Sequence, residues 1–240
     1  MTDSAPTPAP APVSTSAPTE ADYAAWVQLD PGGFVRVIRL ATHWIWDHVF
    51  RLKSYHADRI PVDGPLLLVP NHSSYMDPFL QIRGQHRLVR FMAKAQLFEM
   101  PVLKHIVKSG GGFPVRRGRG DTFAMDLARR MLQTGQPVVV YAEGTRYRKS
   151  LELGPAKSGA ARLALETGVP VVPIASWGSK ERELYGRPWW RRPKVTTLYG
   201  EVMHFDGLEP TPENIERVRV EIWDAVQKLY EEVRELAATR

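Results

Sequence analysis

The chain has 240 residues, which is enough for one α/β domain with a large core or for two small domains. It contains no cysteine, which excludes disulfides, thiol nucleophiles and cysteine-ligated metals and fits a reducing compartment. The net charge of +6 indicates an anionic partner such as nucleic acid, a phosphorylated metabolite or an acidic membrane surface. Because no apolar run reaches about 18 residues, the sequence predicts no transmembrane helix, and the amino terminus lacks a signal-peptide pattern.

The first part of the chain is divided into a tail and a helical segment. Residues 1–20 are mainly Ala, Pro, Ser and Thr, and they carry too few large apolar side chains to offset the entropy of ordering, so a disordered tail is predicted. Residues 21–54 form the predicted amphipathic helical segment, with its main helix from Phe34 to about Lys53. Its apolar positions recur at steps of three and four: Phe34, Ile38, Ala41, Ile45, Val49 and Leu52. This helix either packs on a core or lies at a bilayer surface, where its aromatic and cationic residues are favoured.

Residues 55–240 alternate between apolar runs typical of buried strands and amphipathic helical patterns. The predicted strands lie at 65–70, 88–93, within 110–118, and at 138–141, 169–174, 195–199 and 201–205. Helices are predicted at 77–83, in short pieces within 96–108, from a cap at Asp121 to Gly135, at 158–167, and from Thr211 onward. This alternation predicts an α/β three-layer sandwich, with a mostly parallel or mixed central sheet flanked by helices.

The segment Asn71-His72-Ser73-Ser74-Tyr75-Met76-Asp77 follows the first predicted strand. Connections after strands line the crevices of α/β folds, and histidine exchanges a proton most readily near neutral pH. A carboxylate five residues later can bond the far ring nitrogen of His72 and stabilise the imidazolium. The alternative interpretation is a simple turn followed by a helix start at Asp77-Pro78.

Three further features follow along the chain. A glycine-rich turn ends in Arg116-Arg117, Glu143-Gly144-Thr145-Arg146 leaves a predicted strand, and Val169-Pro170-Val171-Val172-Pro173-Ile174 forms another. Arg117 and Arg146 suit a phosphate, because a guanidinium is a planar fork of donors, although either could instead pair with a surface carboxylate. Gly144 permits close backbone approach and Thr145 supplies a hydroxyl.

The order of these four features resembles the lysophospholipid acyltransferases of the glycerolipid pathway, the 1-acylglycerol-3-phosphate acyltransferase family. That family carries Asn-His-x-x-x-x-Asp, Gly-x-x-Phe/Leu-Ile/Val-x-Arg, Phe-Pro-Glu-Gly-Thr-Arg-Ser and Val-Pro-Ile/Val-x-Pro-Val/Ile. The corresponding segments of this chain are residues 71–77, 111–117, 141–147 and 169–174. The departures are Ala142 for Pro, Tyr147 for Ser, and Pro114 inside the second motif. None removes a functional group that the chemistry needs.

The resemblance implies an enzyme that moves a fatty acyl group from acyl-CoA or acyl carrier protein to the hydroxyl of a lysophospholipid. The favoured reaction is conversion of 1-acylglycerol-3-phosphate to phosphatidic acid. His72 is then the general base, Asp77 orients it, and the residues for the acceptor are Arg117, Glu143, Gly144, Thr145 and Arg146. No cofactor and no metal is expected, since no histidine shows metal-ligand spacing. The expected location is peripheral, on the cytoplasmic face of the cell membrane and on anionic lipid.

The stretch 177–194 mixes tryptophan and tyrosine with lysine and arginine. It could stack bases, sit at a lipid headgroup interface, or form a basic loop with partly buried tryptophans. With the four motifs present, membrane contact is favoured and nucleic acid is not expected. There are three alternative hypotheses. They are acylation of a different lysolipid or alcohol acceptor, a non-catalytic membrane- or nucleic-acid-binding protein on the same fold, and hydrolysis of acyl thioesters by water.

Overall fold

A seven-stranded sheet is the centre of the computed structural model, which describes residues 20–27, 47–48, 51–81, 87–101, 103–115, 122–146, 151–180 and 194–239. The strands are β1 (Lys53–Tyr55), β2 (Leu66–Pro70), β3 (Arg90–Lys94), β4 (Gly112–Val115), β5 (Pro137–Val139), β6 (Val171–Trp177) and β7 (Thr196–Tyr199). Their order in the sheet is β1-β7-β6-β2-β5-β3-β4. Every pair is parallel except β6–β7, so the predicted mostly parallel α/β sheet is confirmed.

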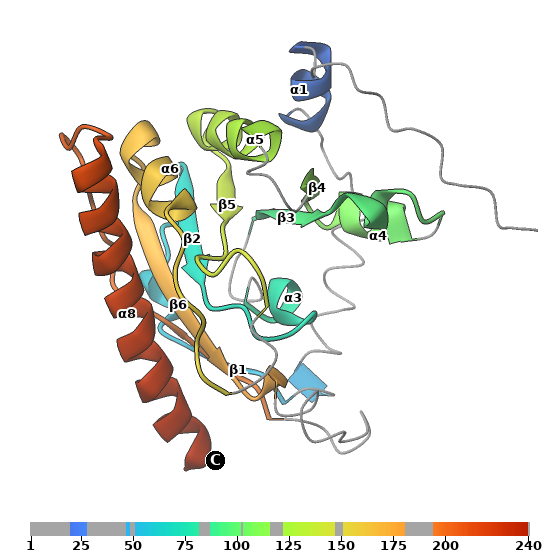
Figure 1. The fold of residues 1–240 in the computed structure, drawn as a ribbon. Coiled ribbons are helices and arrows are strands. Elements are labelled where there is room, and N and C mark those ends of the chain that lie inside the picture. The colour runs from blue at the N-terminus through green and yellow to red at the C-terminus, as the bar shows by residue number, and fades with distance from the viewer. Residues whose placement is uncertain are drawn as a thin grey trace, which may run out of the picture.

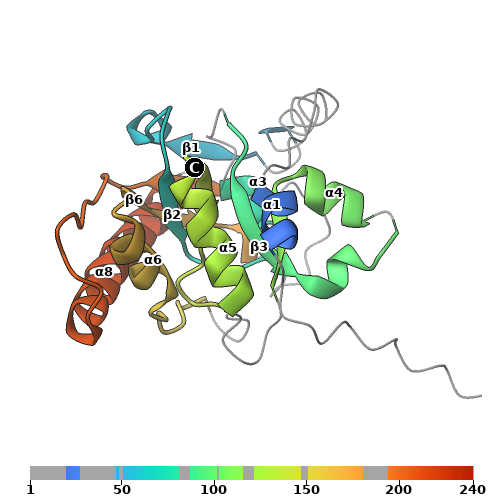
Figure 2. The same ribbon diagram turned by 90° about the horizontal axis from the view of Figure 1, so that it is seen from above.

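Helices cover both faces of this sheet. They are α1 (Glu20–Val27), α3 (Asp77–Gln81), α4 (Leu103–Ser109), α5 (Thr122–Gln133), α6 (Gly159–Thr167) and α8 (Pro212–Ala238), with short 3-10 turns η1 (Ala57–Arg59) and η2 (Ala95–Phe98). Figures 1 and 2 show α5, α6 and α8 side by side along one face, while α4 lies at the β3–β4 end of the sheet. Among the residues that the structure describes, no helix is long and apolar enough to cross a bilayer.

The central strand β2 shows why the fold has two cores. Successive side chains of a strand point to opposite faces, so a strand buried on both sides must be apolar throughout. Leu67 and Val69 belong to a cluster with the inner faces of α5, α6 and α8. Leu66 and Leu68 belong to a second cluster on the other face, together with Val107 of α4. The apolar run predicted as a buried strand at 65–70 therefore forms a fully buried strand over Leu66–Pro70.

The long helix α8 closes one side of the sheet along β6. Its first turn is capped by Thr211, whose hydroxyl accepts a hydrogen bond from the Asn214 N–H at 3.2 Å, and Pro212 occupies the first turn, as the sequence predicts. Apolar side chains recur at helical spacing and face the protein. The buried ones are Val218, Ile222, Trp223, Val226, Tyr230 and Val233. In Figure 1 this helix runs the full length of the sheet and ends at the carboxyl terminus.

One predicted boundary of the N-terminal segment is wrong. Helix α1 begins at Glu20, where the predicted tail ends. The helix predicted to end near Lys53 cannot extend that far, because Lys53–Tyr55 forms strand β1, paired in parallel with β7. Edge pairing with β7 supplies backbone partners there, which overrides the helical periodicity. Elsewhere in that predicted helix the structure describes Asp47 and His48, which are helical, and Arg51 and Leu52, which are not; its other residues lie outside the described part of the chain.

The predicted strand at 201–205 is also wrong. Only one isolated antiparallel bridge forms there, between Met203 and Val171. β6 pairs with β7 up to Ile174 and Tyr199, and the next bridge joins Val171 to Met203, so three residues (200–202) on one side face two (172–173) on the other. Pro173 lies in this gap and has no N–H to continue the ladder, so the pairing breaks at the bulge.

Candidate active site

The loop that carries His72 leaves the carboxyl end of β2 and leads into α3 (Figure 1). The preceding residue, Asn71, is completely buried and ties this loop to β6. Its N–H donates to the Ile174 carbonyl at 3.3 Å. Its side-chain oxygen accepts the Ser176 N–H at 2.8 Å, and its side-chain nitrogen donates to the Ser176 carbonyl at 3.2 Å. These bonds fix the backbone from which the imidazole projects.

His72 and Asp77 are in direct contact, with Nδ1 of the imidazole 3.2 Å from Oδ2 of the carboxylate. The same oxygen accepts the backbone N–H groups of Ser73 at 2.5 Å and Ser74 at 2.7 Å. Because an ionised carboxylate can only accept, Nδ1 must carry the hydrogen and Nε2 keeps its lone pair. That tautomer and orientation are what a general base requires.

Ser179 holds the other oxygen of the same carboxylate. Its hydroxyl donates to Oδ1 of Asp77 at 2.9 Å, and both side chains are buried. Ser179 follows the end of β6. The carboxylate of Asp77 is therefore held by the N–H groups of its own loop and by a hydroxyl that follows the neighbouring strand. The sequence alone did not indicate this contact, because 102 residues separate the two positions.

Glu143 leaves the end of β5 and contacts the backbone of His72. Its Oε1 accepts the His72 N–H at 2.9 Å and its Oε2 accepts the Gly154 N–H at 3.3 Å. Burial raises the pKa of Glu143 from its ordinary value near 4.5 to about 7, against the opposing effect of these two donors and of the Lys180 ammonium. Both carboxyl oxygens thus bind backbone donors, which fits a group that positions the His72 loop.

Tyr141 forms a wall beside the imidazole. Its ring stacks on that of His72 with centroids 3.9 Å apart and planes at 24°. The hydroxyl is buried and has no hydrogen-bond partner among the residues that the structure describes. Burial, together with the nearby charge of Asp77, raises the pKa of Tyr141 well above its ordinary value, so the phenol is neutral. The face of a neutral aromatic ring favours a cation, and therefore an imidazolium, next to it.

Arg146 lies against the same loop. Its guanidinium carbon is 3.2 Å from the centroid of the Tyr75 ring, and Tyr75 lies between His72 and Asp77 in the chain. Arg146 is buried, and its Nη1 has no hydrogen-bond partner in the described part of the chain. Since a guanidinium offers a fork of donors, an unused nitrogen here can bind an anionic group such as a phosphate.

Gly144 and Thr145 form the turn between Glu143 and Arg146. Gly144 has a φ of 64°, which favours glycine, and a Cβ at this position would lie 2.9 Å from the Lys157 side chain. Thr145 is exposed. The turn thus carries Glu143 inward and leaves the Thr145 hydroxyl accessible to solvent.

The structure brings together most of the predicted site residues. His72, Asp77 and Glu143 form one connected group, and Arg146 joins it through Tyr75. Arg117 lies outside the described residues, as does the greater part of the 177–194 stretch. Among the residues placed by the structure, no three His, Asp or Glu side chains gather as metal ligands.

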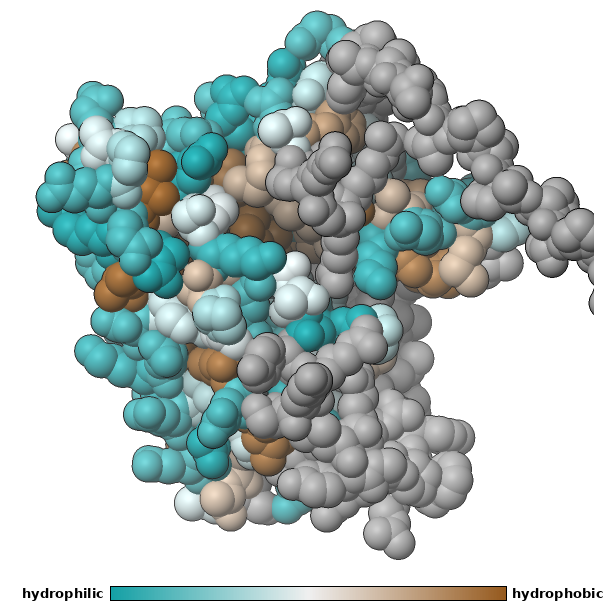
Figure 3. Space-filling view, viewed as in Figure 1, coloured by the Kyte–Doolittle hydropathy of each residue, from teal (hydrophilic) through white to brown (hydrophobic). Residues whose placement is uncertain are grey.

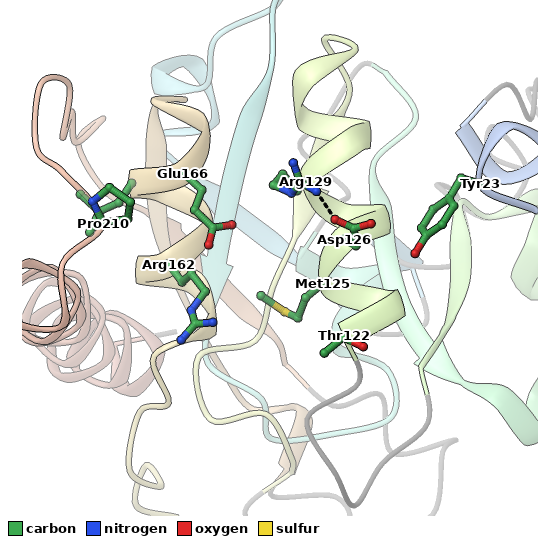
Figure 4. Close-up of a pocket in the computed structure, with 9 residues that line it drawn as sticks. Tyr23, Thr122, Met125, Asp126, Arg129, Arg162, Glu166 and Pro210 are labelled. Atoms are coloured by element: carbon green, nitrogen blue, oxygen red, sulfur yellow. Dashed lines mark hydrogen bonds and ion pairs between the residues drawn. The ribbon is translucent and has the colours of Figure 1, made fainter. Parts of the chain in front are cut away.

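A separate groove of about 730 Å³ lies between α5 and α6 (Figure 4). Its wall carries Asp126 and Arg129 from α5, which pair with each other, and Arg162 and Glu166 from α6. Two cations and two carboxylates balance its charge, and none of the site residues described above lines it. The groove is therefore distinct from the His72 site.

A comparison against known families matches the part of the chain that contains this site. The sequence model described as Acyltransferase matches residues 51–177, which is more than half of the chain and includes His72, Asp77, Glu143 and Arg146. The chain belongs to the Acyltransferase family.

Named relatives of this acyltransferase-family chain are similar over part of their length. A Mycoplasma genitalium protein described as "Probable 1-acyl-sn-glycerol-3-phosphate acyltransferase" is 29% identical over 152 residues, 61% of this chain and 56% of that protein. A chloroplastic 1-acyl-sn-glycerol-3-phosphate acyltransferase of Brassica napus is 34% identical over 120 residues, 49% of this chain and 34% of that protein. The chain thus spans about half of the first relative's length and about a third of the second's.

A solved structure supports the fold of this acyltransferase-family chain. The crystal structure of the 1-acyl-sn-glycerophosphate acyltransferase from Thermotoga maritima superposes with a TM-score of 0.59 and 24% sequence identity. The match covers 85% of this chain and 90% of the Thermotoga chain. At this identity the similarity establishes the shared α/β fold.

Two residues of this acyltransferase-family site were missed at the level of sequence. The resemblance covers the aligned stretch that contains Tyr141, but nothing in that motif indicates that its ring stacks on His72. Ser179 lies five residues after the Val-Pro-Val-Val-Pro-Ile segment, close to the carboxyl ends of the parallel strands β2 and β6. Strand-end position is the one signal that could have drawn attention to it.

Proposed function

We propose that the chain is an O-acyltransferase that moves a fatty acyl group from an acyl thioester to the free hydroxyl of a lysophospholipid. The observation that supports this proposal most directly is the contact of His72 Nδ1 with the buried Asp77 carboxylate, in a chain of the Acyltransferase family. The relatives named above act on 1-acyl-sn-glycerol-3-phosphate, and this favours conversion of that lipid to phosphatidic acid as the reaction.

In the proposed reaction, Nε2 of His72 takes the proton of the acceptor hydroxyl as its oxygen attacks the thioester carbonyl carbon. The tetrahedral intermediate collapses, the carbon–sulfur bond breaks, and the imidazolium returns the proton to the leaving thiolate. Asp77 holds Nδ1–H and stabilises the imidazolium while it exists. The stacked ring of Tyr141 favours the same charged form. A covalent acyl-enzyme is not needed, so no step runs through Ser73.

We assign binding of the acceptor phosphate to two arginines, Arg146 and Arg117. Arg146 is supported by its burial, its unused Nη1 and its position against the loop that carries His72. Arg117 is assigned to the same phosphate by the sequence motif alone. Gly144 and Thr145 form the adjoining turn, and Glu143 fixes the His72 backbone.

The donor and the location are part of the proposal. Acyl-CoA and acyl carrier protein both present the thioester that the chemistry requires, and no cofactor takes part. A lipid acceptor is held in a bilayer, and this favours a peripheral position on the cytoplasmic face of the cell membrane.

The decisive experiment measures transfer of labelled acyl groups from acyl-CoA to lysophosphatidic acid. His72→Ala removes the base and should lower the rate by about a hundredfold or more. A matched control is His204→Ala, because His204 also faces a carboxylate, Asp206, but both side chains are mostly exposed. The control should keep full activity.

Each outcome has a clear meaning for the proposal. Transfer that collapses only in His72→Ala supports both the reaction and the base. Transfer that survives in His72→Ala contradicts the assigned base. If neither wild type nor variant acylates lysophosphatidic acid or other lysolipids, with CoA or carrier-protein donors, the acyltransferase proposal is wrong.

A further inference from the structure

Tyr75 is the exposed residue of the segment that carries His72 and Asp77. In the view of Figure 3 the surface over α8 is mostly hydrophilic, and the structure describes only five large hydrophobic or aromatic residues as exposed. Tyr75 is one of these five and is 61% exposed, whereas His72 and Asp77 are buried. Packing of the core therefore does not account for an aromatic ring at this position.

Hydrogen bonds fix the backbone on both sides of Tyr75. The Asp77 N–H donates to the Ser74 carbonyl at 3.4 Å, and the Met76 N–H donates to the Ser74 hydroxyl at 3.3 Å. The Ser74 N–H in turn donates to Oδ2 of Asp77 at 2.7 Å, the oxygen that also contacts His72. Tyr75 thus lies at the tip of a turn that the carboxylate holds in place, and its backbone has a defined position relative to the imidazole.

The ring of Tyr75 lies on the face of the Arg146 guanidinium, whose central carbon is 3.2 Å from the ring centroid. Arg146 is buried, and it forms no ion pair with a carboxylate in the described part of the chain. The N–H groups of a guanidinium point outward in its own plane, so a ring on its face leaves them available. The contact therefore orients the guanidinium without using its donors.

This contact links two separate parts of the site. Tyr75 belongs to the loop after β2, and Arg146 belongs to the turn after β5, the parallel neighbour of β2. A phosphate bound by Arg146 is thereby placed relative to the loop that holds His72. Because the acceptor hydroxyl must reach the base within hydrogen-bond distance, this placement affects which acceptors are well positioned to react.

We propose that Tyr75 is a positioning residue that orients Arg146 for the acceptor phosphate and so gives the enzyme a preference for lipids that carry phosphate. The ring acts on the guanidinium and not on the reacting atoms. Its loss should weaken binding of a phosphate-bearing acceptor and leave the chemical step nearly unchanged. The inference rests on the proposed function, in which Arg146 binds the acceptor phosphate, and deepens it by assigning the choice of acceptor class to the Tyr75 ring.

The test measures lipid binding in the absence of any acyl donor. Hexanoyl lysophosphatidic acid and hexanoyl monoacylglycerol, which differ only in the phosphate, are titrated into the full chain by calorimetry. Wild type should bind the phosphate-bearing lipid more tightly. Tyr75→Leu should bind that lipid roughly fivefold to tenfold less tightly, because the guanidinium loses its cation–π contact, whereas Tyr75→Phe keeps the ring and should bind as wild type does. Neither variant should change the affinity for monoacylglycerol.

A double variant shows whether the ring acts through Arg146. Arg146→Ala should weaken binding of lysophosphatidic acid, and addition of Tyr75→Leu should weaken it no further. The matched control is Tyr23→Leu, which removes another tyrosine ring from an arginine, with the Arg130 guanidinium carbon 4.1 Å from the ring centroid, outside the His72 site. This control should bind both lipids as wild type does. In steady-state acyl transfer, Tyr75→Leu should raise KM for lysophosphatidic acid and leave kcat close to that of wild type.

Thermal unfolding should show that all of these variants are folded. The proposal is overturned if Tyr75→Leu binds lysophosphatidic acid as tightly as wild type does, or if it weakens binding of both lipids equally, as general damage to the loop would. It is also overturned if wild type binds the two lipids with equal affinity. Phosphate-dependent binding that requires the Tyr75 ring, in a chain that transfers no acyl group, would count against the proposed function alone.

Discussion

The hydroxyl of Ser179 donates a 2.9 Å hydrogen bond to Oδ1 of Asp77, the carboxylate oxygen that does not face His72. The other oxygen accepts Nδ1–H of the imidazole at 3.2 Å and the N–H groups of Ser73 and Ser74. Rotation of the carboxylate would break bonds on both oxygens at once. Ser179, which follows the end of β6, thus helps to orient the imidazole of His72, which follows the end of β2.

Ser179→Ala should lower kcat with little change in KM for either substrate. The variant leaves one buried carboxylate oxygen without its donor, and a hydrogen bond to a charged group is worth about 1.5–3 kcal/mol, so a decrease of roughly tenfold to a hundredfold is expected. Ser179→Thr keeps the hydroxyl and should restore part of the lost rate. Steady-state kinetics over a range of pH provides the measurement.

The control for this variant is Ser158→Ala. Ser158 is exposed and makes no side-chain cap bond at the start of α6, so its loss should leave kcat unchanged. Equal kcat values for Ser179→Ala and wild type would show that the contact does not position the catalytic pair.

Much of the fold was predictable because its main signals are local. The apolar run at β2 and the capped, periodic helix α8 both require only neighbouring residues, and both predictions are confirmed. The proximity of His72 and Asp77 is also local, because five residues of turn and helix start bring the carboxylate back to the imidazole. Glu143 was predicted as one of the residues for the acceptor, and its contact with the His72 N–H could not be named from the sequence.

The features that escaped prediction depend on the arrangement of strands. Ser179 meets Asp77, and Tyr141 meets His72, only because β6 and β5 flank β2 in the sheet, an order that spacing does not encode. The edge strand β1 overrode a helical pattern for the same reason, since β7 offers it backbone partners. In each case a tertiary neighbour decided the outcome.

Glu143 should make the free energy of unfolding depend on pH. Its pKa is raised to about 7 in the folded chain, so between about pH 4.5 and 7 the folded state binds more protons than the unfolded state. Stability from this group is therefore present at low pH and is lost as the pH rises through 7. The full difference is at most about 3 to 4 kcal/mol, since one pKa unit corresponds to about 1.4 kcal/mol.

Urea unfolding at about pH 5 and about pH 8 measures this effect. Glu143→Gln does not ionise and should show a smaller decrease over that interval than wild type. Glu166→Gln, which alters an exposed glutamate on α6, should retain the wild-type slope. If Glu143→Gln and wild type lose the same free energy, another group is responsible for the pH dependence.

Two variants of Tyr141 can separate the contribution of its ring to activity from that of its hydroxyl. Tyr141→Phe keeps the ring that stacks on His72 at 3.9 Å and removes a buried hydroxyl without a partner in the described residues, so activity should be retained. The same change should leave stability unaltered or raise it by about 1 kcal/mol, because an unsatisfied buried hydroxyl is unfavourable. The family motif carries phenylalanine at this position, so Tyr141 is one more departure from the motif, in addition to Ala142, Tyr147 and Pro114.

Tyr141→Leu removes the aromatic face and should lower kcat by roughly fivefold to tenfold, as the imidazolium loses a contact worth about 1 kcal/mol or more. A stacked ring favours the charged imidazole, so its loss should also move the acidic limb of the pH–kcat/KM profile to lower pH. Comparison of the two variants in the acyl-transfer assay isolates the ring, since both lack the hydroxyl. Equal activity and equal pH profiles in Tyr141→Phe and Tyr141→Leu would mean that the stack on His72 contributes packing alone.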